Sequence, residues 1–165
     1  MIFLYIAIGI AALALLQLSV HTLSYRILKN RTINKRIWDL NICCGKTDGG
    51  GVNADVMKHI DVPNFVQITD IYHLPFRDKQ FKKALCSHTI EHIENPERFH
   101  RELSRVAEEV TLIIAPLWDV GSVINVFEHK WIFLSFRKNH TSLPRHIRLP
   151  GSRAVQSRIG QQIRA

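Results

Sequence analysis

The sequence has no acidic residue near either end and only three cysteines. Residues 1–38 and 129–165 contain lysines and arginines but no Asp or Glu, so all 14 acids lie in the middle of the chain. Two of the cysteines, Cys43 and Cys44, are adjacent and poorly placed to bridge each other. This excludes a disulfide framework and favours a reducing compartment. Basic ends favour anionic surfaces such as lipid headgroups. They lack the interleaved aromatic residues of nucleic-acid binders, so we expect no nucleic-acid partner.

The N-terminus is the one long hydrophobic run. Residues 2–20 are apolar except for Gln17 and Ser19, and five basic residues follow within residues 26–36. About 20 such residues span a bilayer as a helix. A signal peptide is the main alternative, but it would need a basic start and a shorter apolar core. We therefore predict a single-pass anchor over residues 1–25, a basic juxtamembrane segment over 26–36, and a cytoplasmic domain by the positive-inside rule.

The rest of the chain is long enough for one domain. Short apolar runs predict strands, and one helix is predicted after Asn95, a typical N-cap, with Pro96 in its first turn. Strands alternating with crossovers predict an α/β fold, a doubly wound and mostly parallel open sheet, which binds ligands at the carboxyl ends of its strands. The predicted strands are residues 37–43, 52–56, 65–69, 81–87 and 110–115.

The segment 40–55, LNICCGKTDGGGVNAD, carries the strongest local signal for a ligand. A strand ends in small residues and glycines, and Asp55 closes the next short apolar run. Glycines let the backbone approach a ligand closely, and a carboxylate at that place can accept hydrogen bonds from ribose hydroxyls. The pattern predicts a nucleoside site at the sheet edge.

With these pieces assembled, the chain resembles the class I S-adenosylmethionine-dependent methyltransferases, which have a Rossmann-like doubly wound fold. The resemblance spans roughly residues 37–118. Five motifs carry it in the family's order: LNICCG at 40–45, VNAD at 52–55, LPF at 74–76, SHTIEH at 87–92 and ELSRV at 102–106.

The resemblance implies S-adenosylmethionine as cofactor and assigns roles along the motifs. The methionine end of the cofactor would lie against the backbone of Asn41, Cys43 and Gly45, and Asp55 would hold the ribose. Asp70 and Ile71 would sit beside the adenine, while Ser87 and His88 would border the sulfonium and the acceptor. His88 or His92 would be the general base and Glu91 would orient it, although Glu91 and His92 could equally cap the next turn. No residue is assigned as a metal ligand.

Three features depart from the family pattern. Cys43 replaces the first glycine of a glycine-x-glycine pair, and the loop between the first two strands is too short for a crossover helix. Only 49 residues follow Pro116, and the family's last two strands are not evident among them. The sequence leaves open whether the sheet is truncated. We assign residues 37–150 to the methyltransferase-like domain and 151–165 to a basic tail.

Two other functions remain open. His88, Glu91 and His92 fit H-x-x-E-H, a zinc-hydrolase motif in which two histidines share a metal on a helix. Alternatively, the altered Cys43 loop and short C-terminus permit a non-catalytic membrane scaffold. For the methyltransferase, the anchor and basic flanks favour a small-molecule or lipid-linked acceptor near the membrane, with anionic lipid as a further partner.

Overall fold

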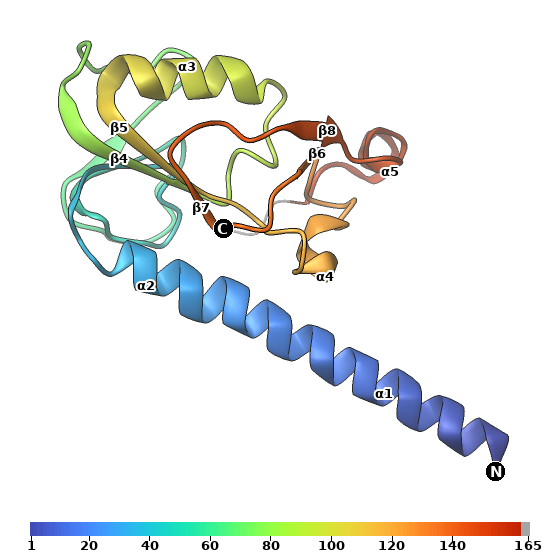
Figure 1. The fold of residues 1–165 in the computed structure, drawn as a ribbon. Coiled ribbons are helices and arrows are strands. Elements are labelled where there is room, and N and C mark those ends of the chain that lie inside the picture. Colours follow the sequence, from blue (N-terminus) through green and yellow to red (C-terminus); the bar gives the residue numbers. More distant parts are fainter. Residues whose placement is uncertain (163–165) are drawn as a thin grey trace.

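The computed structural model describes residues 1–162, which form an α/β body with a long helix projecting from it (Figure 1). The central sheet has six strands in the order β3-β2-β1-β4-β5-β7, in which β7 alone runs antiparallel to its neighbour. This is the doubly wound, mostly parallel order that the sequence predicts. The strands are β1 Trp38–Ile42, β2 Gly50–Asp55, β3 Phe65–Gln67, β4 Phe81–Ser87, β5 Ala107–Ile113 and β7 Asn139–His140.

Helix α3, Pro96–Val106, covers one face of the sheet. It begins where the sequence predicts, because the Asn95 side chain accepts a hydrogen bond from the Arg98 amide at 2.8 Å. Phe99 and Leu103 are fully buried among apolar side chains from the strands. Ala84 and Cys86 of β4 face this cluster, while Leu85 between them points to the opposite face, as the period of a strand requires.

The N-terminal helix covers part of the opposite face. Helix α1 (Ile2–His21), the π-helical segment η1 (Thr22–Leu28) and α2 (Lys29–Ile33) follow one another without a break, so the helix extends beyond the predicted boundary at residue 25. Ile33 packs with Trp38, and the Trp38 indole donates to the Thr32 carbonyl at 3.2 Å.

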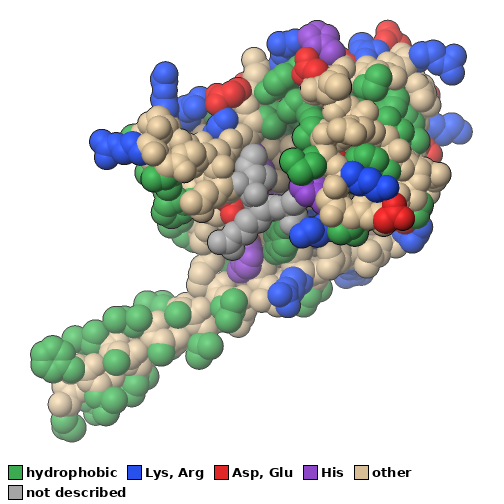
Figure 2. All heavy atoms as spheres, turned by 180° about the vertical axis from the view of Figure 1, so that it is seen from behind, with side chains coloured by type: hydrophobic (Ala, Val, Ile, Leu, Met, Phe, Trp, Pro, Cys, Tyr) green, Lys and Arg blue, Asp and Glu red, His purple; other side chains and the backbone are tan. Residues whose placement is uncertain are grey.

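The projecting part of this helix is apolar on all sides. Helix α1 buries no residue, and Figure 2 shows hydrophobic side chains along its visible face. Its most apolar window has a mean hydropathy of 2.3. By length and composition the helix can cross a membrane.

Strands β1 and β2 are parallel neighbours although no helix joins them. The connection is the loop 43–49, and Trp38 lies opposite Gly50 in the register. The second strand is therefore present, although it spans Gly50–Asp55 rather than the predicted 52–56, and the usual crossover helix is absent. Strand β2 lies so close to β1 that a Cβ on Gly51 would stand 2.5 Å from the Asp39 carbonyl oxygen, which explains the glycine.

The C-terminal part is built from short pieces. Strands β6 (Trp131–Phe133) and β8 (His146–Arg148) form a separate antiparallel pair, and α4 (Val120–Val123) and α5 (Ser152–Ile159) flank it. Within residues 1–162, the two-residue β7 is all that extends the main sheet beyond β5, so the sheet is shortened at this edge. Helix α5 makes up most of the predicted basic tail. The last three residues of the tail, 163–165, lie outside the described part of the chain.

Candidate active site

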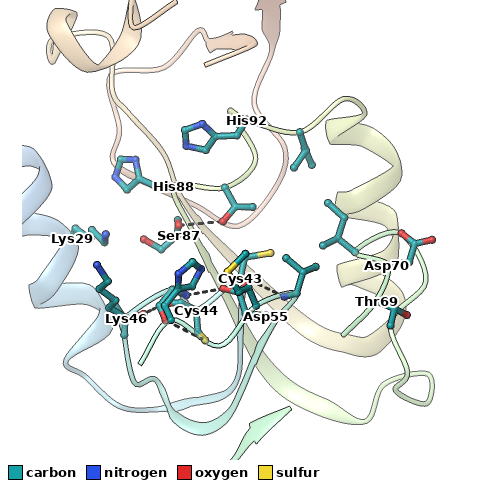
Figure 3. Close-up of a pocket in the computed structure, with 18 of the residues that line it drawn as sticks. Lys29, Cys43, Cys44, Lys46, Asp55, Thr69, Asp70, Ser87, His88 and His92 are labelled. Carbon is teal, nitrogen blue, oxygen red and sulfur yellow. Dashed lines mark hydrogen bonds between the residues drawn. The ribbon is translucent and has the colours of Figure 1, made fainter. Parts of the chain in front are cut away.

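A cavity of about 700 Å³ opens at the carboxyl ends of β1, β2 and β4 (Figure 3). Strand ends converge there because parallel strands finish at the same edge of a sheet. Of the residues predicted for the site, the cavity brings together Cys43, Gly45, Asp55, Asp70, Ile71, Ser87 and His88. Lys29 and Lys46 lie on one side of it, and Thr69 and Asp70 on the opposite side.

Asp55 is buried at the end of β2 and fixes the loop that follows β1. The Gly45 amide donates to its Oδ2 at 2.8 Å, and the Val56 amide donates to its Oδ1 at 2.7 Å. Gly45 has a φ of +55°, a conformation that suits glycine. A carboxylate has about four acceptor positions, so the two amides leave positions for further donors from the cavity.

Asp70 is a more exposed carboxylate at the far side of the cavity. The His73 ring contacts its Oδ2 at 2.8 Å, and the Tyr72 amide donates to its Oδ1 at 2.7 Å. The hydrogen bonds from His73 and then from Tyr72 lower the pKa of Asp70, so it is ionised at neutral pH. Ile71 contributes an apolar surface beside it.

Cys43 stands in the left-handed region with a φ of +51°. Glycine adopts this region without strain, so the backbone at Cys43 favours the glycine that the family has at this position. Burial raises the pKa of the Cys43 thiol well above its ordinary value, and burial raises that of Cys86 to about 12. Both sulfurs are therefore neutral thiols rather than nucleophilic thiolates.

Ser87 and His88 follow β4 at the cavity wall. The Ser87 hydroxyl is buried and has no hydrogen-bond partner among the described residues. The His88 Nε2 lies 2.7 Å from the Lys138 ammonium, and its Nδ1 lies 3.4 Å from Glu91. Burial lowers the pKa of His88 to about 4. The neutral ring presents its Nε2 lone pair to Lys138, so His88 must lose this contact before it can accept a proton from a substrate.

Asn41 and Glu91 do not line the cavity and support residues around it instead. The Asn41 amide donates to the Thr47 carbonyl and to Asn53, both at 3.0 Å, and so shapes the loop after β1. Glu91 is buried and accepts from the Ala115 amide at 2.8 Å. Burial by itself would raise the pKa of Glu91, but the hydrogen bond from His88 and the attraction of His88, His129 and His92 together outweigh it, so the pKa is lowered.

Several site residues were missed in the sequence, and three of them lie far from the motifs. Tyr25 and Lys29 come from the N-terminal helix and line the cavity, with the Tyr25 ring 5.1 Å from the His88 ring and the Lys29 ammonium 4.0 Å from the Tyr25 ring centre. Lys138 reaches His88 and also donates to Ser24 at 3.0 Å. The basic run after the apolar segment was visible, but nothing local indicates that it forms a cavity wall.

The zinc-hydrolase interpretation of the H-x-x-E-H motif is wrong. Residues 88–95 form turns rather than a helix, so the two histidines do not share one helical face. His88 contacts Lys138, whereas the His92 ring packs edge-on against His129. A metal cation at the His88 Nε2 would stand beside the Lys138 ammonium, and the repulsion between the two positive charges disfavours it.

Comparisons with known proteins agree with the motifs. Residues 49–114 match the family model described as a methyltransferase domain. No curated protein matches the chain. Similar solved structures include the YcgJ protein from Bacillus subtilis (18% identity, TM-score 0.43, 53% of this chain and 50% of that one). A Thermotoga maritima protein described as a SAM-dependent methyltransferase, possibly acting on histamine, is 19% identical (TM-score 0.44, 59% and 54%). The PH0226 protein from Pyrococcus horikoshii is 15% identical (TM-score 0.46, 81% and 79%).

The chain spans about half the length of the first two of these proteins, 50% and 54%. Because these proteins are so distantly similar to this chain, they do not indicate its substrate. The family match covers β2 to β5 with α3, and so includes β2 and β4, whose ends line the cavity. Residues 49–114 of this chain thus match a class I methyltransferase family, whose members use S-adenosylmethionine as cofactor.

Proposed function

We propose that this protein is a membrane-anchored methyltransferase that binds S-adenosylmethionine in the cavity and methylates an acceptor at the membrane surface. The observation that carries the proposal is the cavity at the ends of β1, β2 and β4, where the carboxylates of Asp55 and Asp70 and the unpartnered hydroxyl of Ser87 line one space. Its volume of about 700 Å³ lies within the usual range for small-molecule sites.

The residues present fit the cofactor. Asp55 would accept hydrogen bonds from the ribose hydroxyls, and Asp70 would accept one from the adenine amine with Ile71 against the ring. The Ser87 hydroxyl would form a hydrogen bond with the cofactor and so gain the partner that it lacks among the described residues. The bound cofactor supplies an activated methyl group that carries its own leaving group, so the protein has chiefly to align the acceptor.

Residues on the helix side of the cavity would position the acceptor. Tyr25 offers an aromatic surface, and the ammonium groups of Lys29 and Lys46 lie on the same side of the cavity (Figure 3). Positive charge there favours an anionic acceptor group, such as a lipid headgroup. Because the His88 lone pair faces Lys138, we assign His88 to positioning rather than to base catalysis.

The N-terminal helix supports a location at the cytoplasmic membrane surface. Basic residues follow its apolar part, which is typical of the cytoplasmic side of an anchor. The body touches the helix at α4, where Gln17 and His21 both contact Asp119. Val120 and Ile124 are about half exposed in this segment, at 51% and 56%. In the proposed orientation these apolar side chains would rest in the interfacial layer of the bilayer.

Cofactor binding is the first test. We would titrate the full chain in lipid nanodiscs with S-adenosylmethionine and S-adenosylhomocysteine by calorimetry. Asp55→Ala should weaken binding at least about tenfold, as expected for loss of a charge-assisted contact. Ser87→Ala should weaken it less. Asp61→Ala removes a carboxylate that is 94% exposed and serves as the control. Absence of heat with both ligands would contradict the proposal.

The acceptor needs a separate test. Turnover should be faster with an acceptor presented in an anionic bilayer than with the same headgroup free in solution. Equal turnover of the two forms would contradict a membrane acceptor without affecting cofactor binding.

A non-catalytic scaffold is the second candidate, and the backbone at Cys43 favours it. A side chain there adds bulk to the cavity at a position with a φ of +51°. Cys43→Gly separates the two functions. If the native chain binds no cofactor and the Cys43→Gly variant does, the native chain is a scaffold whose cavity the cysteine closes.

A further inference from the structure

We infer that His92, Glu128 and His129 form a binding site for a transition-metal ion of the zinc type, beside the cavity. One ligand atom from each of the three side chains lies within 4.8 Å of the others. The site differs from the H-x-x-E-H motif, because His88 takes no part and two ligands come from the segment after α4. It also stands independently of the proposed methyl transfer.

The two histidines have nitrogens available for a metal. The His92 Nδ1 lies 3.0 Å from the Glu128 carbonyl oxygen. A carbonyl only accepts, so Nδ1 carries the proton and the Nε2 lone pair is left for an ion. Histidines that bind metals commonly donate their second nitrogen to a carbonyl in this way. The His129 side chain is buried, with 3% exposure, and its Nδ1 has no hydrogen-bond partner among the described residues.

The charge around the cluster also favours a cation. Glu128 contributes one carboxylate, and the buried Glu91 is close enough to act electrostatically on both histidines. The Glu91 Oε2 is a further buried atom without a partner in residues 1–162. The buried Glu91 carboxylate beside the two imidazoles places negative charge where there is little water, and a divalent cation would offset that charge.

Three segments hold the cluster in place. The Gln161 amide donates to the carbonyl oxygens of His92 and Glu128, at 2.8 and 2.6 Å. The amides of Lys130 and Trp131 both donate to the Glu91 carbonyl. His92 also lines the cavity, which gives an ion a path from solvent (Figure 3).

The donor set indicates which ion fits. Two imidazoles and a carboxylate, with water as fourth ligand, are a typical set for zinc. Tetrahedral ligands at about 2.1 Å from zinc stand about 3.4 Å apart. The three side chains would therefore close by at most about 1.4 Å when the ion enters. A bound ion would tie the C-terminal segment to the loop that carries Ser87 and His88.

Metal binding can be measured on the full chain in detergent micelles. After treatment with a chelator and dialysis, Zn²⁺ should bind with about one ion per chain, and Co²⁺ in its place should give a visible spectrum with nitrogen and oxygen ligands. Zinc should also raise the thermal midpoint of the native chain. Glu128→Gln and His129→Ala should each weaken binding at least about tenfold.

Two controls separate this site from adventitious binding. His140→Gln removes a histidine outside the cluster, and Cys44→Ser removes a thiol; both should bind zinc as the native chain does. Glu128→Gln keeps the size of a half-buried side chain, so it remains informative if His129→Ala does not fold. Absence of zinc binding by the native chain, equal binding by Glu128→Gln, or loss of binding in Cys44→Ser would overturn the inference.

Discussion

The sheet and the C-terminal part of this protein share one body but are held together differently. Residues 38–115 are joined by strand pairing and by an apolar core under α3. Residues 116–162 contain only two- and three-residue strands and short helices. Phe133 packs into the core, and long-range contacts from polar side chains also attach this part to the rest. Lys138 reaches Ser24, and Gln161 donates to the carbonyl oxygen of His92. The first region should therefore unfold as one unit, and the second should open locally.

The largest effect should come from the core under α3. Phe99→Ala removes a fully buried ring, so it should lower the free energy of unfolding by about 3–5 kcal/mol. Urea denaturation measures this loss. Hydrogen exchange should show the same loss of protection at every amide of the sheet. Phe136→Ala removes a ring that is 72% exposed in the C-terminal part and should change stability by less than about 0.5 kcal/mol. Equal losses in the two variants would erase the contrast between the regions.

A second test concerns the close approach of β1 and β2. Gly51→Ala places a methyl group 2.5 Å from the Asp39 carbonyl oxygen, and we expect a loss of about 1–3 kcal/mol on denaturation. Gly9→Ala is the matched control, because no heavy atom outside its own helix lies within 4 Å of that Cβ. An unchanged free energy of unfolding in Gly51→Ala would mean that the two strands can move apart without cost.

The third test uses pH to probe the attachment of the C-terminal part through Lys138. Burial lowers the pKa of Lys138 from 10.5 to about 8. Between these values the unfolded chain binds more protons than the folded chain, so this group makes stability rise with pH. From pH 8 to pH 9 the rise should be about 1 kcal/mol.

Lys138→Met should remove that rise, and the difference between the two denaturation profiles isolates it from the other titrating groups. Lys58→Met, which alters a lysine that is half exposed, should keep the native profile. Identical profiles for the native chain and Lys138→Met would show that Lys138 is not buried in solution.

The smallest effect should come from Gln161, whose amide joins the carbonyl oxygens of His92 and Glu128. Gln161→Ala should cost about 0.5–1.5 kcal/mol. Hydrogen exchange should quicken in the segment from α4 to β6 while amides of β4 and β5 stay protected. Exchange that quickens equally in the sheet would show that the two regions unfold together.

The same contrast explains what the sequence could and could not predict. Strand β4 has the predicted bounds, and α3 begins at the predicted cap, because their signals are local: a run of apolar residues, and Asn followed by Pro. The start of β5 was set too late, since this strand follows α3 directly at Ala107. Most of the predicted site residues line the cavity, because strand ends are visible in the pattern.

The wall formed by Tyr25 and the partners of Lys138 could not be predicted. The contact between Lys138 and Ser24 joins residues 114 positions apart, and no period or motif encodes it. Strands of two or three residues, such as β6 to β8, are too short to produce an alternating pattern. In both cases tertiary packing, not local preference, decides the structure.

The uninterrupted helix from Ile2 to Ile33 has a consequence for geometry. In the proposed membrane-bound protein a flexible linker would let the body tumble, whereas a continuous helix joined to β1 through residues 34–37 fixes both the height and the direction of the cavity mouth. Each residue added in α1 ahead of Gln17 would turn the body by about 100° relative to the N-terminal end of the helix and move it by about 1.5 Å. A single residue inserted there would thus point the cavity mouth in another direction while Tyr25 and Lys29 keep their places in its wall.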